Sequence, residues 1–265
     1  MIPNFSILGK TFSVYMILAL IGVFVTLIYI YKMSVRLKCD EIEALKLSIF
    51  AFAGAAIGGH ILYGFTNFSD MIKLFSNLFH FSSFGEFVNR CTEVFGGSVF
   101  YGGLIAVLTI AFIHMKATKN KYSELYDIGA SAIPLFHGFG RIGCFLSGCC
   151  YGTESSIGVI YYHSPVSVAN GIRRFPIQLV EAAFNFTIFA LLFYCLKKAK
   201  FKGRLIAVYL ISYSTIRFIL EFFRGDDYRG FIGILSTSQF ISIILFTLAI
   251  LYLTVKSAQS KRLNK

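Results

Sequence analysis

Long apolar segments alternate with short polar segments along the whole chain. Most of the apolar segments are close to the ~20 residues that an α-helix needs to cross a bilayer. The pattern therefore predicts an all-α, polytopic membrane protein with seven transmembrane helices. The predicted spans are residues 11–31, 44–64, 94–115, 125–146, 176–196, 205–223 and 231–254.

The fourth apolar segment differs from the others in composition. It contains Pro134, His137 and four glycines. A proline inside a helix removes a backbone hydrogen bond, so we expect it to kink this one. Backbone groups freed at membrane depth have to pack against protein or line a cavity. We expect this segment to do one or the other.

The polar segments alternate in positive charge. Fifteen lysines and arginines follow the first, third, fifth and seventh spans, and seven lie in the other four segments. The positive-inside rule then predicts an N-terminus outside the cell and a C-terminus in the cytoplasm. An odd number of spans agrees with this orientation. The end of the fourth span, including Arg141, and the loop after it would then be extracytoplasmic.

The composition supports a membrane protein. The chain is 56% hydrophobic and only 14% charged, whereas soluble domains are about 45–50% apolar and about 25% charged. The net charge of +12 resides mainly between the spans. It therefore indicates topology control and affinity for anionic lipid head groups, and no nucleic-acid partner is expected.

We find no internal repeat, so residues 1–265 are predicted to form a single transmembrane helical bundle with outer loops at about 65–93 and 147–175. The first apolar segment lacks a small-residue cleavage site and is interpreted as a retained span. Apolar side chains in the first loop predict an interfacial helix on the outer leaflet. These are Phe75, Phe79, Phe81, Phe84 and Phe87.

The stretch HGFGRIGCFLSGCCYG, residues 137–152, combines an arginine with three cysteines at the end of an apolar segment. An arginine beside hydrocarbon is costly and marks a functional site. Three roles remain open for Cys144, Cys149 and Cys150: a soft-metal site, a disulfide that holds the loop (for instance to Cys91), or a nucleophilic thiol activated by Arg141. We assign no resident metal and expect no cofactor.

A second polar cluster, RFILEFFRGDD, lies at residues 217–227 of the sixth span. Arg217, Glu221 and Arg224 are spaced i, i+4 and i+7, which predicts one shared helical face. Two interpretations remain. The cluster could be a self-neutralising ion pair, or an anion site in which Glu221 holds one arginine and another is free for phosphate.

Further polar residues lie near the ends of other spans. Paired glycines flank Tyr101 in GGSVFYGG and precede His60 in GGHILYG, which predicts close helix packing and leaves room for polar side chains. His60 could be a hydrogen-bonded packing residue or a functional group. Gln178 and Glu181 are spaced i and i+3 at the start of the fifth span, where structural pairing and site lining are both open.

The order of these motifs resembles the prolipoprotein diacylglyceryl transferases. GRIGCFLSGCCYG, FPIQLVE and YSTIRFILEFFRGDD occur on the fourth, fifth and sixth spans in the family's order. VYMILALIG, GGHILYG, GGSVFYGGL and STSQFISI match landmarks elsewhere, so the likeness covers nearly the whole chain. The resemblance implies a seven-helix enzyme that transfers a diacylglyceryl group from phosphatidylglycerol to the thiol of a lipobox cysteine and releases glycerol phosphate.

Residue roles follow from the resemblance alone. It implies that Arg141 binds the phosphatidylglycerol head group and that Arg217 assists catalysis, with Tyr101 at the third catalytic position. Glu221 and Arg224 would orient these groups. The expected substrate-binding residues are Arg141, Gly140, Gly143, Tyr15, His60, Glu221, Arg224 and Gln178.

The chain departs from the family pattern at several of these positions. Tyr101 stands where the family usually has histidine, and His60 where it has arginine. Cys144, Ser147 and Cys149 replace two asparagines and a glutamate. The arginines expected to bind phosphate are retained.

The sequence thus predicts a multi-pass enzyme of the bacterial cytoplasmic membrane with phosphatidylglycerol and a prolipoprotein signal peptide as partners. Two alternatives are kept. One is a related lipid-dependent transferase with a different acceptor that uses Cys149 or Cys150. The other is a non-catalytic protein that binds or transports anionic lipid.

Overall fold

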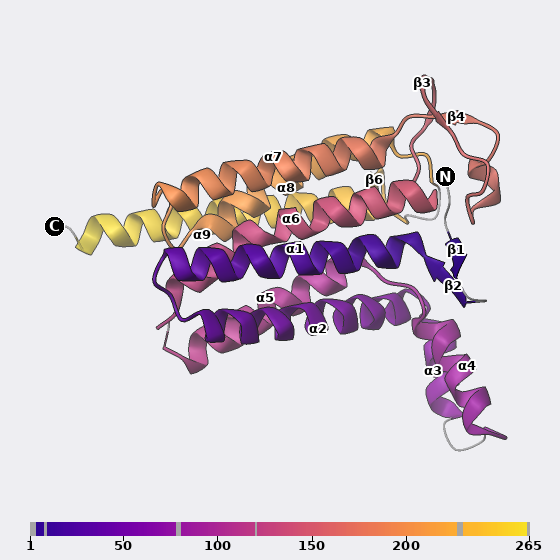
Figure 1. The fold of residues 1–265 in the computed structure, drawn as a ribbon, viewed down its shortest axis with the longest axis horizontal. Coiled ribbons are helices and arrows are strands. Elements are labelled where there is room, and N and C mark those ends of the chain that lie inside the picture. Colours follow the sequence, from indigo (N-terminus) through magenta and orange to yellow (C-terminus); the bar gives the residue numbers. More distant parts are fainter. Residues whose placement is uncertain (1–3, 8–9, 78–80, 120, 227–229, 264–265) are drawn as a thin grey trace. The chain divides into compact units, whose positions relative to one another are not determined.

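The computed structural model describes residues 4–7, 10–77, 81–119, 121–226 and 230–263. The protein is mostly helical (Figure 1) and forms two compact units. One consists of residues 1–37 and 124–265, and the other of residues 38–123. Phe79 and Asp227 lie outside the described residues, and the prediction of a single bundle stays a prediction.

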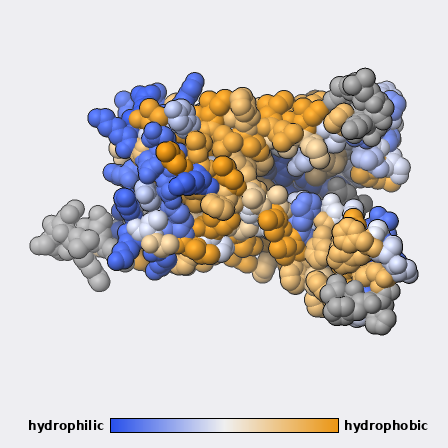
Figure 2. All heavy atoms as spheres, turned by 60° about the horizontal axis from the view of Figure 1, so that its bottom comes forward, coloured by the Kyte–Doolittle hydropathy of each residue, from blue (hydrophilic) through white to orange (hydrophobic). Residues whose placement is uncertain are grey.

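Six helices within the described residues are long and apolar enough to cross a membrane. Leu20, Phe24 and Phe50 are among the many large apolar side chains that they expose, as suits contact with lipid rather than water. In Figure 2, orange hydrophobic residues cover the middle of the helices and blue hydrophilic residues gather toward their ends. The structure therefore supports a polytopic helical membrane protein.

The helix that corresponds to the fourth predicted span, α6 (Ser123–Ser147), is not one of these six. It is long enough, but Glu124, Asp127, His137 and Arg141 lie along it. It continues through Pro134, and twelve of its residues are buried. Seven spans and the orientation of the termini stay predictions.

The larger unit contains α1 (Val14–Arg36), α6, α7 (Ile177–Lys197), α8 (Leu205–Leu220) and α9 (Thr237–Leu263), which run side by side in Figure 1. The Tyr29 hydroxyl of α1 hydrogen-bonds to Ser131 of α6 at 2.7 Å. Asp127 of α6 accepts hydrogen bonds from the backbone N–H groups of Gly203 and Leu205. A carboxylate at a helix N-terminus satisfies unpaired donors, so Asp127 fixes the start of α8 against α6.

The smaller unit is organised by close contact between α2 (Glu41–Thr66) and α5 (Phe100–Ala117). A Cβ atom on Gly58 would lie 2.5 Å from the Gly102 carbonyl oxygen, and one on Gly102 would lie 2.2 Å from that of Gly58. Only glycine permits this approach, which confirms the packing interpretation of the paired glycines.

The loop predicted at about residues 65–93 forms two helices, α3 (Phe68–Ser76) and α4 (Phe84–Phe95). Phe75 and Phe84 are exposed. The Ser83 side chain caps α4 by accepting from the Glu86 N–H, and the Glu86 carboxylate accepts from the Ser82 N–H. The prediction of helix in this loop is confirmed, with two helices in place of one.

Short antiparallel hairpins, which the all-α prediction missed, flank several helices. They are β1 (Asn4–Ile7) with β2 (Lys10–Ser13), β3 (Glu154–Ile160) with β4 (Arg173–Arg174), and β5 (Phe231–Ile232) with β6 (Leu235–Ser236). The loop predicted at about residues 147–175 also holds a 3-10 turn, η1 (Ser167–Ala169), and a small core of Tyr151, Tyr161 and Ala169.

Three predicted helix starts were therefore too early. Residues 11–13 belong to a strand before α1, and residues 231–236 form a hairpin that turns at Gly233, whose φ is 62°. The glycines at 96 and 97 and the extended Val99 separate α4 from α5. Hydropathy alone did not distinguish an apolar hairpin from the first turn of a membrane helix.

Candidate active site

The end of α6 is shaped by Gly148, which has a left-handed φ of 77°. The Gly148 N–H donates to the Phe145 carbonyl and the Cys149 N–H donates to the Cys144 carbonyl, at 3.2 Å each. This is the Schellman arrangement of a helix C-terminus. It turns the chain back over the last turn of α6, and so brings the Cys149 side chain beside Cys144.

Arg141 lies one turn earlier on α6 and is held along one edge. Its Nε is 3.0 Å from a carboxylate oxygen of Glu181 on α7 and donates to Nε2 of His137 at 3.3 Å. Among the described residues, no side chain or backbone group pairs with its two terminal nitrogens. The Arg141 side chain keeps 11% exposure. Its terminal amino groups are therefore available to a ligand.

Arg217 is buried on α8 and is also held from one side. Its Nη2 forms an ion pair with Glu221 and donates to the Ser238 hydroxyl at 3.0 Å. Its Nη1 is buried without a hydrogen-bond partner among the described residues. A buried donor of this kind costs about 1–3 kcal/mol when left unsatisfied. The unused nitrogen is thus a candidate contact for an anion.

Arg224 does not share the helical face of Arg217. The helix α8 ends at Leu220 and tightens into a 3-10 turn, η2 (Glu221–Phe223), so Arg224 lies in extended backbone. Its guanidinium makes a two-point contact with Asp226, through Nε–Oδ1 at 2.7 Å and Nη2–Oδ2. The i, i+7 prediction was wrong here because it assumed that helical periodicity continues beyond Leu220.

Glu181 is the carboxylate at which these groups converge. It is 1% exposed, and the charges of Arg141, Arg217 and Arg224 all act on it. Each arginine also forms an ion pair with one carboxylate. The pairs are Arg141–Glu181, Arg217–Glu221 and Arg224–Asp226. The charges of the site are thus balanced in pairs while donors of Arg141 and Arg217 remain unused.

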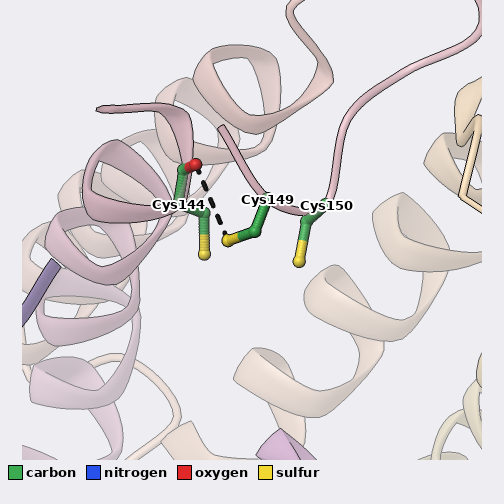
Figure 3. A group of neighbouring side chains, drawn as sticks. All are labelled: Cys144, Cys149 and Cys150. Atoms are coloured by element: carbon green, nitrogen blue, oxygen red, sulfur yellow. Dashed lines mark hydrogen bonds between the residues drawn. The ribbon is translucent and has the colours of Figure 1, made fainter. Parts of the chain in front are cut away.

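The three clustered cysteines form a compact group of sulfur atoms. The Sγ atoms of Cys144, Cys149 and Cys150 all lie within 4.8 Å of one another, and Figure 3 shows them side by side at the end of α6. The Cys149 thiol donates to the Cys144 carbonyl at 3.7 Å. No disulfide joins Cys91 to Cys144, Cys149 or Cys150, so the suggested link between the loop and Cys91 is not formed in this structure.

The thiols differ in acidity because of their surroundings. The neighbouring thiols of Cys144 and Cys149 lower the pKa of Cys150 below its usual range, and the positive charges of Arg224 and Arg141 add to the effect. The Cys150 thiol is therefore more acidic than an isolated cysteine.

Gln178 supports the segment that carries these thiols. Its side-chain amide donates to the Cys149 carbonyl at 2.7 Å and pairs with the hydroxyl of the buried Tyr161. Gln178 contacts the turn after α6 and Glu181 contacts α6 itself, which agrees with the shared direction that their i, i+3 spacing predicted. Tyr15 packs against Gly143, where an added Cβ would be 3.1 Å from the tyrosine ring, whereas nothing lies within 4 Å of a Cβ on Gly140.

His60 and Tyr101 belong to the smaller unit. His60 Nδ1 lies 2.8 Å from the Phe95 carbonyl and 2.7 Å from the Gly97 carbonyl. Carbonyl oxygens only accept, so Nδ1 carries the proton and His60 ties α2 to the α4–α5 connection. This contact supports the packing interpretation of His60. Tyr101 is half-buried near the start of α5, with its ring 5.7 Å from that of Phe100.

Several site residues had no predicted role. His137 contacts Arg141 and stacks near Tyr213, with ring centroids 5.2 Å apart, and its i, i+4 spacing from Arg141 was the available signal. Ser238 and Asp226 hold arginines from a distant helix and from a turn, and no sequence spacing indicated either contact.

Comparisons with known proteins agree with this arrangement. The family model described as prolipoprotein diacylglyceryl transferase matches residues 4–255. The chain is similar to the phosphatidylglycerol–prolipoprotein diacylglyceryl transferase of Clostridium tetani, with 32% identity covering 93% of each chain. It is also 34% identical to transferase 2 of Clostridium perfringens, covering 91% of this chain and 90% of the relative. The protein therefore belongs to the prolipoprotein diacylglyceryl transferase family.

Proposed function

We propose that this protein transfers a diacylglyceryl group from phosphatidylglycerol to the thiol of a lipobox cysteine in a prolipoprotein. The observation that carries the proposal is the pair of buried arginines, Arg141 and Arg217. Each is held by a carboxylate along one edge and keeps at least one nitrogen unused. The names of the relatives supply the donor and the acceptor class.

The unused nitrogens suit the phosphate of the donor lipid. Guanidinium is planar, remains charged and matches phosphate geometry, and charge-assisted hydrogen bonds of this kind are about twice as strong as neutral ones. Glu181 and Glu221 fix the orientation of the two arginines before the lipid arrives. The lipid phosphate would fill the donors that the protein leaves unsatisfied.

The transfer is a substitution at carbon. The acceptor sulfur forms a bond to the terminal glyceryl carbon while the bond from that carbon to the phosphate oxygen breaks. Glycerol phosphate leaves, and Arg141 and Arg217 stabilise the negative charge that develops on it. The phosphodiester carries one negative charge and the released phosphate monoester carries two. The proton lost by the acceptor thiol balances the added charge, and it is free to leave to solvent at neutral pH because the second pKa of a phosphate monoester is about 6.

We assign Tyr101 to the position of the family histidine. A phenol with a pKa near 10 is a weak base at neutral pH. Tyr101 is therefore not assigned the removal of the thiol proton.

An apolar groove beside Arg217 fits an acyl chain of the donor. It has a volume of about 250 Å³ and lies between α8 and α9. Phe218, Ile243 and Phe246 supply much of its apolar wall, and Phe218 is the next residue after Arg217. A phosphate held by Arg217 would thus leave an attached acyl chain close to this groove.

We further propose that α6, the fourth predicted span, also crosses the membrane and brings the number of spans to seven. The protein would then lie in the bacterial cytoplasmic membrane with the N-terminus outside and the C-terminus in the cytoplasm. The charge difference between alternate polar segments supports this orientation. It places Arg141 and the second outer loop on the extracytoplasmic side. The exposed phenylalanines of α3 and α4 would then rest on the outer leaflet.

Incubation of the purified protein with phosphatidylglycerol and a synthetic lipobox peptide tests the proposal. Mass spectrometry should show a peptide heavier by one diacylglyceryl group, with an equal amount of glycerol phosphate released. A peptide with serine in place of the lipobox cysteine is the control and should remain unmodified.

The other outcomes separate the alternatives. Glycerol phosphate released without a peptide adduct would indicate a different acceptor. Bound lipid with neither product would overturn the transferase proposal and favour a lipid-binding protein.

A further inference from the structure

The thiol group formed by Cys144, Cys149 and Cys150 has no role in the transfer reaction proposed above. From its geometry, we propose that it binds one thiophilic d10 metal ion, Cu(I) or Zn(II), through three sulfur ligands. The proposal does not depend on the transferase activity, because its test measures the metal itself.

The distances suit such an ion. A metal–sulfur bond of about 2.3 Å places three sulfurs around one ion about 4.0 Å apart. The three Sγ atoms already lie within 4.8 Å of one another. Contraction by less than about an ångström, which side-chain rotation supplies, would bring all three into the coordination sphere.

The backbone holds the thiols in this position before any ion binds. The Schellman turn at Gly148 brings Cys149 beside Cys144. Cys150 has a φ of 56°, a left-handed conformation that costs a non-glycine residue about 1–2 kcal/mol. Gln178 fixes the Cys149 carbonyl from α7. Two nearby glycines, Gly148 and Gly152, are buried where an added Cβ would clash with neighbouring atoms.

Two arginines, each paired with a carboxylate, act on the thiols that would form an anionic complex. Three thiolates around Cu(I) or Zn(II) carry a net negative charge, and the charges of Arg141 and Arg224 act on Cys150. Thiolate ligands select Cu(I) and Zn over harder ions such as Mg²⁺ and Ca²⁺. Among the described residues, no histidine or carboxylate joins the three sulfurs as a fourth ligand. A three-coordinate Cu(I) site or a Zn(II) site completed by water would both fit.

The test uses the full-length protein, purified in detergent, reduced without oxygen and desalted. Zn(II) and Cu(I) are added in separate experiments, each in competition with a coloured chelator for that ion. Metal bound after desalting is measured by mass spectrometry. We expect one equivalent of at least one ion, with affinity reduced more than about tenfold in Cys144→Ser, Cys149→Ser and Cys150→Ser, because even loss of an outer-shell partner costs 10–100-fold.

Matched controls distinguish a built site from scattered thiols. Cys91→Ser and Cys195→Ser change thiols outside the group and should bind as the parent does. Each variant is also examined by size exclusion and thermal melting without metal, so that a misfolded variant is recognised. If one cluster variant misfolds, the other two still test the site.

Two results would overturn the proposal. One is failure of the reduced parent to retain either ion. This result counts against the site whether or not two of the three thiols formed a disulfide before reduction. The other is equal loss of metal from the Cys91→Ser control and the cluster variants, which would show that no single site exists.

Discussion

The contact between α2 and α5 and the junction of α6, α7 and α8 share one sequence feature. Each has paired or closely spaced glycines next to an ionisable side chain, His60 in one and Arg141 in the other. In the first region the glycines bring two backbones together and His60 donates to carbonyl oxygens. In the second, Arg141 is fixed along one edge by Glu181 and keeps its terminal nitrogens unused.

A packing residue and a binding residue differ in how completely the protein satisfies their hydrogen-bond donors. The known contacts of His60 are made by backbone groups of the same unit. Arg141 and Arg217 are buried charges whose partners satisfy only part of their donors. Such incomplete pairing is costly unless a ligand completes it. Substitutions in the two regions should therefore differ in their effects on activity and on stability.

The largest effect is expected from Arg217→Gln. This change removes the charge and the unused donor beside the phosphate, and should lower kcat/KM roughly 10²–10³-fold, as loss of one charge-stabilising donor does elsewhere. Arg90→Gln is the matched control, because Arg90 is an exposed arginine paired with Glu93 on α4. Rates that fall equally in both variants would contradict a special role for Arg217.

Glu181→Gln should lower the activity by changing the position of Arg141, because Glu181 does not itself contact the lipid phosphate in the proposed reaction. The amide keeps the shape of the carboxylate but no longer holds Arg141 by charge, so we expect about a 10²-fold loss, the scale of a displacement near 1 Å. The affinity for phosphatidylglycerol should fall together with the rate. A normal lipid affinity with an unchanged rate would show that Arg141 is oriented by other groups.

Tyr101→Phe should have a smaller effect. Removing the hydroxyl deletes one hydrogen bond, so the loss should remain below the roughly 10²-fold expected for a full general acid or base. Tyr101→His restores the residue usual in the family and should retain activity. An inactive histidine variant that is correctly folded would contradict the assignment of Tyr101 to that position.

The smallest effect on the rate is expected from Gly58→Ala, although its effect on stability should be clear. Its Cβ would meet the Gly102 carbonyl, and overpacking of this kind costs about 1–3 kcal/mol. The melting temperature should therefore fall, while the rate per folded molecule stays near that of the parent. Gly129→Ala, with no neighbouring atom within 4 Å, should not lower the melting temperature, because alanine favours a helix more than glycine does.

Hydropathy predicted the positions of the long helices because transmembrane segments need continuous apolar sequence. Charge pairs between helices could not be predicted in the same way. The Arg141–Glu181 contact joins α6 to α7 and depends on tertiary packing, whereas Arg217–Glu221 is an i, i+4 pair that the spacing did indicate. Arg224 was misplaced because a helix can tighten and end without a proline or glycine at its last turn.

The cysteine segment shows the same limit at shorter range. A glycine after a helix favours a left-handed C-terminal turn, so Gly148 could have indicated the contact between Cys144 and Cys149. The third sulfur could not be placed, because it depends on the unusual φ of Cys150. The sequence thus indicated the Arg217–Glu221 pair, but it did not give the positions of Arg224 and of the third thiol.

The most direct test compares Arg141→Gln and His60→Gln in one transfer assay at equal amounts of folded protein. We expect Arg141→Gln to lower phosphatidylglycerol binding and transfer by about the 10²-fold expected for Glu181→Gln. We expect His60→Gln to stay within about threefold of the parent, since it alters a packing contact. The opposite order, with His60→Gln inactive and Arg141→Gln active, would contradict the placement of the chemistry at the junction of α6, α7 and α8.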